Sequence, residues 1–437
     1  MDKWGKLTLF LIIGYLSASR SFAYLGIPWI NIYIGEIALA TFLFFGPSTK
    51  QGSWIRFVWR IRRFRRFEHL VLLLLFYGAF EALHGICSGY PAFTAARDTA
   101  FNYYSLFVLL GVWAGLRDRD LLRRTALGLA WWNGCYGLAY VLFLSAVPWA
   151  MPGTTNRASE IVPLFSEPIG SGIAILGLFA FEPKLRRVWY LLVLNAVVML
   201  WVQMRAEWFG FIVGLFVFAW LTKRIRPLLI ACGILIAVIG IMYLGDVHLP
   251  SAKGRGGQIS VDAIIARGVA PIDKSMADNL APPEDVVGYA GTAKWRLVWW
   301  ANIWETIHSN PLRALIGLGY GYPIGDLNPF IEQGRFIQTP HNDFFYALGY
   351  SGWIGVVIFV LLQIELLRLL WRSYKVTGQP FGLMCWTALI VLSMFGDFFE
   401  SPMGGISFFL VMGVALAPAL LGKKKEPSRH IGSAFAS

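Results

Sequence analysis

Residues 339–362 read TPHNDFFYALGYSGWIGVVIFVLL, so a short polar cluster leads directly into a long apolar run. Thr339 is a suitable helix N-cap, and Pro340 suits the first helical position. His341 and Asn342 would then lie in the first turn, where unpaired backbone N–H groups favour a bound anion and a neutral imidazole. A neutral histidine is suited to general-base catalysis near neutral pH. The alternative is that both residues only cap a helix at the lipid headgroups.

Composition identifies the class of protein around this stretch. Of the 437 residues, 57% are hydrophobic and only 14% are charged, which is typical of a polytopic membrane protein rather than a soluble one. The 19 tryptophans and 17 tyrosines fit aromatic belts at the membrane–water interfaces. The four cysteines are far apart, and no Cys or His spacing typical of a metal site occurs. We therefore predict no disulfide framework, no zinc site and no cofactor.

Apolar segments long enough to cross a bilayer recur along the chain, when tilt and frayed ends are allowed for. They fall near residues 7–20, 25–46, 68–87, 100–116, 125–148, 166–181, 187–203, 207–222, 227–245, 344–371, 378–396 and 404–421. We therefore expect an all-α polytopic membrane protein with about 12 transmembrane helices. Nine of them would occupy residues 1–245 and three would occupy 344–421, with a long loop at 246–343 between them and a tail at 422–437.

The 38 lysines and arginines orient this bundle. If the N-terminus faces the cytoplasm, most of them fall on that side, and the short loops follow the positive-inside rule throughout. Both termini are therefore predicted to be cytoplasmic, with loop 246–343 on the outer side. The net charge of +13 reflects this orientation rather than nucleic-acid binding. The arginines and aromatic residues interleaved at 54–67 are likewise interpreted as an interfacial helix on the anionic cytoplasmic leaflet.

The long outer loop has two different halves. Residues 251–291 are rich in Gly, Pro, Ala and Asp, and are predicted to be irregular. Thr292 is expected to cap a helix at 293–308, whose four tryptophans would lie on the bilayer or cover a cavity. The sequence GLGYG at 317–321, centred on Gly319, either lets backbone N–H groups approach a phosphate or forms only a tight turn.

Two outer-side arginines each have two interpretations. Arg205 lies in QMRAEW at 203–208, between two apolar runs with almost no loop. An arginine at the centre of a bilayer costs about 2.5–3.5 kcal/mol on insertion scales, so it usually faces a partner or a cavity. Arg205 is therefore either a snorkelling side chain paired with Glu207 or part of a phosphate clamp. Arg296, on the predicted loop helix, has the same two interpretations.

Other charged residues have simpler interpretations. The remaining outer-side arginines are expected to be interfacial anchors: Arg20, Arg97 and Arg157. Glu36 and Glu81 lie within apolar segments and are expected to be buried partners of such arginines. Asp397 and Glu400 could supply carboxylates to a reaction. The simpler expectation is that they form a solvated turn before Pro402. The other histidines have no site context: His69, His84, His248, His308 and His430.

This combination of features resembles the O-antigen ligase family: two arginines and one histidine on the outer side, and one long outer loop, in a chain of about twelve helices. That family belongs with the O-antigen polymerases and other membrane glycosyltransferases of the GT-C type. Its pattern His-[Asn/Ser/Gln]-x9-Gly-x2-[Gly/Thr/Tyr] is matched by His341, Asn342, Gly352 and Gly355. The stretch at 310–321 also resembles the family sequence before this histidine. The resemblance in topology covers nearly the whole chain, whereas the motifs are short and partly shared with polymerases.

The arginines extend the resemblance. Arg205 corresponds to the arginine of an Arg-x3-Leu pattern, with Phe209 in place of the leucine, and Arg296 corresponds to the family's arginine on the loop helix. The resemblance implies an enzyme of the bacterial inner membrane, with its active site on the periplasmic face. It would move a glycan from undecaprenyl diphosphate to a hydroxyl of lipid A–core. Arg205 and Arg296 would bind the diphosphate, His341 would be the general base, and neither a metal ion nor a nucleotide would be needed.

Three alternatives keep the membrane location and change the activity. An O-antigen or exopolysaccharide polymerase would use a second lipid-linked repeat as acceptor, and a protein O-oligosaccharyltransferase would use Ser or Thr. A transporter of lipid-linked saccharides would require discontinuous helices in related halves. The polar groups instead gather on one face of the membrane, which favours an enzyme. Thr339, Asn342, Glu207 and Gly319 are the expected supporting residues.

Overall fold

The computed structural model describes most of the chain. The described residues are 1–27, 32–46, 65–155, 161–182, 184–246, 249–250, 258–270, 273–280, 283–330 and 339–421. Several predictions fall outside these ranges: most of the interfacial helix at 54–67, Arg157, His248, His430 and the tail at 422–437.

Helices make up most of the described structure. The α-helices are α1 (Lys3–Ala23), α2 (Ile34–Phe45), α4 (Arg65–Cys87), α5 (Ala92–Asp98), α6 (Ala100–Tyr103), α7 (Phe107–Arg117), α8 (Leu121–Leu142), α9 (Ser171–Phe181), α10 (Trp189–Val202), α11 (Arg205–Thr222), α12 (Arg226–Leu244), α13 (Val261–Val269), α14 (Lys274–Asp278), α15 (Pro283–His308), α16 (Pro311–Ile316), α17 (Asp343–Thr377), α18 (Phe381–Ser393) and α19 (Ser407–Leu421). The shorter helical turns are η3 (Tyr104–Leu106), η4 (Leu144–Ala146), η5 (Leu185–Arg187), η6 (Ile324–Leu327) and η7 (Pro402–Ile406). Strands form three antiparallel pairs: β1 (Gly26–Ile27) with β2 (Ile32–Tyr33), β3 (Ala150–Thr155) with β4 (Ile161–Pro163), and β5 (Leu249–Pro250) with β6 (Gln258–Ile259). The predicted all-α fold class is confirmed.

Within the described ranges, five stretches of helix are long and apolar enough to cross a membrane. They are Arg66–Cys87, Ala92–Arg117, Arg205–Thr222, Asp343–Thr377 and Pro402–Leu420. Shorter apolar helices occupy Ile34–Phe45, Ser171–Phe181, Trp189–Val202, Leu228–Leu244 and Phe381–Ser393. Each of the twelve predicted apolar segments contains a helix. The chain is thus an all-α protein with the helices of a membrane protein, while the number of twelve spans stays a prediction.

The segment at 25–46 begins differently from the prediction. It opens with the hairpin of β1 and β2, and its helix, α2, starts only at Ile34. The backbone N–H of Tyr33 donates to the Glu36 carboxylate over 3.2 Å, which fixes the start of the helix. Glu36 also accepts a hydrogen bond from the hydroxyl of Tyr103 over 3.0 Å. These two contacts tie it to the hairpin and to α6, whereas an arginine partner was the expectation.

The long loop is more helical than the sequence predicts. Helices α13 and α14 form within residues 251–291, which were expected to be irregular. Ser260 caps α13 and Asp273 caps α14, each by accepting hydrogen bonds from backbone N–H groups of the first turn. Helix α15 begins at Pro283 instead of near Thr292, so the tryptophan-rich helix is longer than predicted.

Small residues let the central helices approach closely. A side chain at Gly111 on α7 would overlap the carbonyl oxygen of Leu410 on α19, and one at Gly413 would overlap that of Val108. Glycine therefore lets these two helix backbones lie in contact. This is the usual packing mode in membranes, where helices associate through small residues and van der Waals contact.

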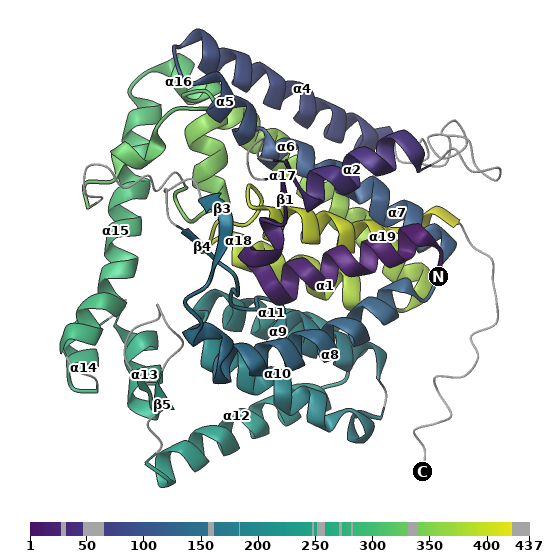
Figure 1. Ribbon diagram of the computed structural model, residues 1–437, viewed down its shortest axis with the longest axis vertical. Helices are drawn as coiled ribbons and strands as arrows, with labels where there is room; N and C mark the ends of the chain where they lie inside the picture. Colours follow the sequence, from purple (N-terminus) through teal and green to yellow (C-terminus); the bar gives the residue numbers. More distant parts are fainter. Residues whose placement is uncertain are drawn as a thin grey trace.

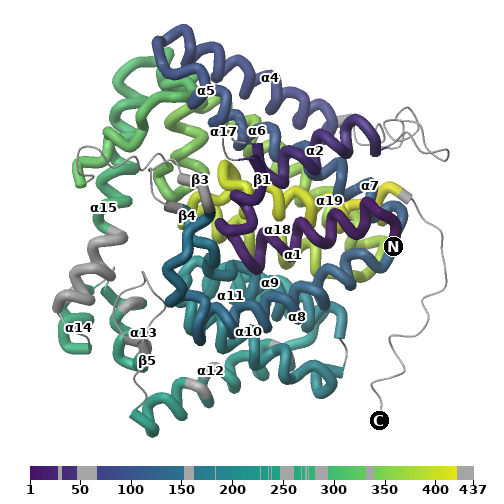
Figure 2. The backbone as a smooth tube through the Cα atoms, viewed as in Figure 1, coloured from purple at the N-terminus to yellow at the C-terminus, as the bar shows by residue number. Residues whose placement is uncertain are grey.

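Helix α15 is set apart from this bundle. It runs along one side of the molecule, across the ends of the other helices (Figure 1). Helix α1 begins and α19 ends on the opposite side (Figure 2). If the N-terminus faces the cytoplasm, α15 therefore lies on the outer side of the membrane.

Helix α17 contains a kink at Gly352, which has φ 58° and ψ −166°. L-residues with a side chain rarely adopt this conformation. A Cβ at this position would also overlap the carbonyl oxygen of Leu315 on α16. Gly352, the first glycine of the family pattern, is thus required where α17 bends to receive α16.

Gly352→Ala is expected to lower the free energy of unfolding by about 3 kcal/mol or more, because backbone strain and steric overlap add. Gly378→Ala is the matched control, since Gly378 also has a positive φ of 73° but no neighbour within 4 Å of a Cβ. It is expected to lose only about 1–2 kcal/mol. Denaturant titration of the purified variants measures both values, and equal losses would mean that the contact with α16 contributes nothing.

Candidate active site

His341 lies in the turn directly before α17. Its φ is 52°, in the left-handed region that residues with a side chain rarely adopt. Its Nδ1 atom lies 2.9 Å from Oδ1 of Asp397, which follows α18. Both side chains are 27% exposed, so the pair is partly open to solvent. Two segments far apart in the sequence thus form a histidine–carboxylate pair.

Asn342, and not Thr339, is the N-cap of α17, so the predicted cap was wrong. The Asn342 Oδ1 atom accepts hydrogen bonds from the N–H groups of Phe344 and Phe345, over 2.9 and 3.2 Å. Its Nδ2 atom donates to the carbonyl of Met394 over 2.9 Å. This second contact reaches the end of α18 and favours Asn342 over Thr339 as the cap. His341 consequently precedes the helix, and was wrongly expected in its first turn.

Pro340 lies against α15 instead. The Trp300 indole N–H donates to the carbonyl of Pro340 over 2.7 Å. The Trp300 ring also stacks on Phe345, with 5.2 Å between the ring centroids. Helix α15 is thereby fixed to the turn that holds His341.

Arg296 on α15 faces the same region. The Trp295 and His341 rings are arranged edge to face, with 5.4 Å between centroids, and the Arg296 guanidinium lies 5.3 Å from the Trp295 ring centre. Burial lowers the pKa of Arg296, while Asp397 acts to raise it and Arg205 acts to lower it. Arg205, Arg296 and Asp397 are therefore close enough to interact electrostatically.

Arg205 is the first residue of α11, and Glu207 lies two positions further along its first turn. Glu207 is only 2% exposed, and its Oε1 atom accepts a hydrogen bond from the N–H of Gly172 over 2.8 Å. This contact occupies a free N–H group at the start of α9. Glu207 thus fixes the start of α11 against α9, which positions Arg205.

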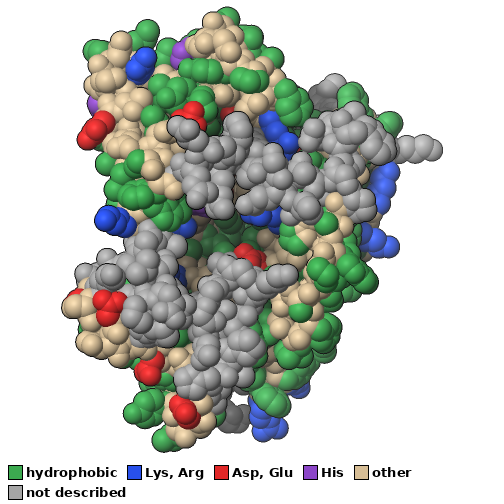
Figure 3. Space-filling view, turned by 60° about the vertical axis from the view of Figure 1, so that its left-hand side comes forward, with side chains coloured by type: hydrophobic (Ala, Val, Ile, Leu, Met, Phe, Trp, Pro, Cys, Tyr) green, Lys and Arg blue, Asp and Glu red, His purple; other side chains and the backbone are tan. Residues whose placement is uncertain are grey.

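The side of the molecule that carries α15 is hollowed near its middle. Figure 3 shows hydrophobic side chains inside the hollow, with Lys or Arg and Asp or Glu side chains beside it. Within the described residues, no group of three or more His, Cys, Asp or Glu side chains is arranged to hold a metal ion.

Residues 190–360 match the family model described as O-antigen ligase. This region belongs to the O-antigen ligase family. Members of the family are glycosyltransferase-like enzymes, both ligases and polymerases. Among curated proteins, none matches the chain. The O-antigen ligase domain contains Arg205, Arg296 and His341, whereas Asp397 lies beyond its end.

Gly319 does not join these residues in the O-antigen ligase domain. The N–H groups of Leu318, Gly319 and Tyr320 donate to the carbonyls of Gly349, Tyr350 and Glu81. The N–H of Gly321 donates to the Asp98 carboxylate over 3.0 Å. Because these groups are all engaged, the glycine-rich stretch forms a tight turn against α4 and α17, and not a phosphate cradle.

Two further carboxyls lie behind the histidine of the O-antigen ligase domain. The Asp343 carboxylate accepts a hydrogen bond from the N–H of Phe399, at 3.1 Å. Glu400 is 8% exposed. Its burial and the neighbouring carboxyls of Asp343 and Asp397 raise the pKa of Glu400 well above its usual range. The solvated turn expected before Pro402 is therefore wrong for Glu400, which is buried where the segment folds inward against α17, whereas Asp397 stays partly exposed.

Sequence reasoning gave Asp397 too little weight. The available signal was an acidic side chain at the outer end of an apolar segment, on the same side as His341. No spacing rule connects the two residues, since only the packing of α17 against α18 brings them together. Trp295 was noted for its aromatic surface alone, and its contact with His341 follows from the docking of α15.

Proposed function

We propose that this protein is an O-antigen ligase. It transfers a glycan from undecaprenyl diphosphate to a hydroxyl of lipid A–core, on the periplasmic face of the bacterial inner membrane. The observation that carries the proposal is the arrangement at His341, which has a carboxylate 2.9 Å from one ring nitrogen and two arginines nearby. The match of residues 190–360 to the O-antigen ligase family supports it.

His341 is the general base in this proposal. Because Nδ1 faces Asp397, the Nε2 atom takes the proton of the acceptor hydroxyl. The hydroxyl oxygen bonds to the anomeric carbon, while the bond from that carbon to the diphosphate breaks and its electron pair leaves on the diphosphate. A single displacement of this kind inverts the anomeric centre. The Asp397 carboxylate stabilises the imidazolium that forms.

Arg205 and Arg296 bind the diphosphate. Guanidinium groups form bidentate, charge-assisted hydrogen bonds with phosphate oxygens. The Nε atom of Arg296 is buried and has no hydrogen-bond partner in the part of the chain that the structure describes. A diphosphate would offer this group an acceptor and would offset the repulsion between the two arginines. The same charges would stabilise the leaving group as it departs, so the proposed reaction is metal-independent.

Asp397→Asn is expected to reduce the transfer rate by roughly 10- to 100-fold. The charge-assisted interaction that this carboxylate would make with the imidazolium formed during transfer is worth about 1.5–3 kcal/mol, and each 1.4 kcal/mol corresponds to tenfold in rate. The rate is measured with purified enzyme and saturating donor and acceptor. Asp326→Asn, at an exposed position on η6, is the matched control. An unchanged rate in Asp397→Asn would remove this carboxylate from the mechanism.

The acceptor decides between this function and its alternatives. Lipopolysaccharide is analysed on gels from a deletion strain of the host that carries wild type or inactive variants at matched protein levels. A ligase leaves bare lipid A–core when it is deleted, while long chains accumulate on undecaprenyl diphosphate. A core with a single repeat unit would indicate a polymerase. Unchanged lipopolysaccharide would overturn both the ligase and the polymerase activity, and would point to a protein acceptor or to transport.

A further inference from the structure

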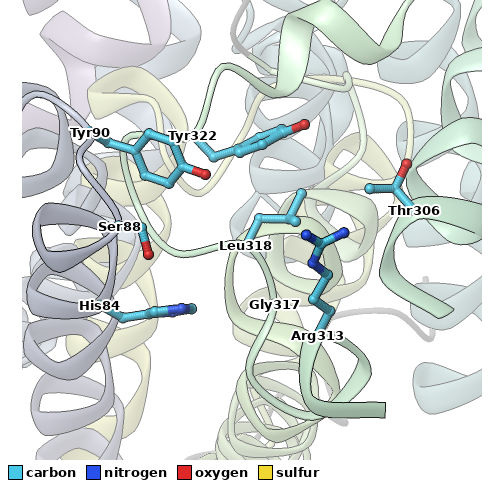
Figure 4. A pocket seen from close by; sticks show the side chains of 8 residues that line it. All are labelled: His84, Ser88, Tyr90, Thr306, Arg313, Gly317, Leu318 and Tyr322. Atoms are coloured by element: carbon cyan, nitrogen blue, oxygen red, sulfur yellow. The ribbon is translucent and has the colours of Figure 1, made fainter. Parts of the chain in front are cut away.

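A second pocket lies at the end of α4, with a volume of about 170 Å³. Its walls come from α4 and the residues after it, from the end of α15, from α16 and from the glycine-rich turn. None of Arg205, Arg296, His341 and Asp397 lines it. Figure 4 shows His84 and Arg313 extending into it from opposite walls, with Tyr90 and Tyr322 across one end.

The lining side chains are cationic or neutral. Arg313 is exposed, and among the residues that the structure describes no carboxylate lies within ion-pair distance of it. The Nδ1 atom of His84 lies 3.1 Å from the buried carboxylate of Glu81, which leaves Nε2 for the pocket. Glu81 thus partners a histidine where the sequence predicted an arginine. A guanidinium and an imidazole on facing walls suit an anion.

Hydroxyl groups complete the lining. Ser88, Thr306, Tyr90 and Tyr322 all contribute to the walls, and the two tyrosine rings meet edge to face with 5.6 Å between centroids. Hydroxyls donate to phosphate oxygens and also accept from a protonated phosphate. No carboxylate lines the pocket. The chemistry therefore fits a phosphate ester.

The surroundings of the pocket are those of a lipid site. Helix α4 is long and apolar enough to cross a membrane, which would place its last turn at one membrane surface. Phe80 stacks on the His84 ring with 6.1 Å between centroids, and Phe80 and Leu83 are exposed on the outside of α4. On the other wall, Leu312 and Leu315 of α16 are also exposed. Apolar surface thus flanks the polar pocket, as an amphipathic ligand requires.

We propose that this pocket binds the phosphate group of a membrane lipid, with the acyl chains lying along α4. The site is separate from the proposed reaction centre, and it does not depend on which reaction His341 performs. Arg313 supplies the charge that pairs with the phosphate, and the His84 Nε2 atom and the tyrosine hydroxyls complete its hydrogen bonding.

Native mass spectrometry of the purified full-length protein tests the proposal by titration. The probes are bisphosphorylated lipid A, lipid A from which both phosphates have been removed, dioleoyl phosphatidylglycerol and inorganic phosphate. We expect a phosphorylated lipid to bind, and Arg313→Gln to raise its dissociation constant about 10- to 100-fold. Preference between lipid A and phosphatidylglycerol identifies the source of the phosphate.

Lys294→Gln is the matched control, because it removes an exposed positive charge from α15 outside the pocket. It is expected to leave the dissociation constant unchanged. Tyr322→Phe removes one hydroxyl from the pocket and keeps the ring in place. Weaker lipid binding in this variant would therefore reflect the lost hydroxyl and not a loss of the fold. Three outcomes would each overturn the proposal. Dephosphorylated lipid A could bind as tightly as the phosphorylated lipid, or inorganic phosphate could bind while no phosphorylated lipid does. Arg313→Gln and Lys294→Gln could also change the dissociation constant equally.

Discussion

His341→Ala is expected to reduce the rate of glycan transfer by about 10²- to 10⁴-fold, the range that general-base catalysis typically contributes. The acceptor hydroxyl would then attack without a group to take its proton. Binding of the donor diphosphate should change little, because the arginines remain. The loss is therefore expected in the maximal rate with both substrates saturating, and not in the donor concentration that gives half of that rate.

The measurement uses purified protein with a lipid-linked glycan donor and lipid A–core. His308→Ala is the matched control, since His308 is an exposed histidine at the end of α15 that contacts Trp304 and Trp353. It should retain the wild-type rate. Full activity of His341→Ala would exclude the general-base mechanism, whichever acceptor the enzyme uses.

Arg296→Gln and Arg205→Gln are each expected to reduce the rate by about 10²- to 10³-fold, as removal of one preorganised charge-stabilising group typically does. Both guanidinium groups act on one diphosphate in the proposed mechanism. The double variant is therefore expected to lose less than the product of the two single losses. Arg296→Lys keeps the charge but loses the bidentate geometry, and should recover only part of the activity.

Donor binding distinguishes this role from a structural one. Titration with a non-transferable undecaprenyl diphosphate analogue should show weaker binding in both arginine variants and unchanged binding in Lys294→Gln. If binding of the analogue stays at the wild-type level in Arg205→Gln and Arg296→Gln, neither arginine holds the diphosphate. If Arg205→Gln lowers the thermal stability and Arg296→Gln does not, the Arg205 side chain stabilises the junction of α9 and α11.

The helices could be predicted because a chain in lipid must satisfy its backbone hydrogen bonds internally. The apolar run at 68–87 accordingly appears as α4, Arg65–Cys87. The hairpin before α2 could not be predicted from hydropathy, since its residues are as apolar as those of the helix that follows. Hydropathy carries no signal for the bend at Gly352, where the close approach of α16 decides the backbone conformation.

The site could be predicted in part. Arg205, Arg296 and His341 were found from polar residues at the ends of apolar segments and from the family pattern, and the structure brings them to one region. The start of α17 was misplaced because Thr and Asn both cap helices well. The deciding contact, from Asn342 to the Met394 carbonyl, joins distant segments. Asp397 was underestimated for the same reason.

The position of Asp397 also limits how this protein can be recombined with a relative. An exchange of residues 190–360 would transfer His341 and both arginines but leave behind the carboxylate that lies 2.9 Å from the histidine. It would also separate Asn342 from the carbonyl that its amide contacts at the end of α18. A chimaera that preserves this pair has to extend through Asp397, so the smallest transferable unit is longer than the O-antigen ligase domain itself.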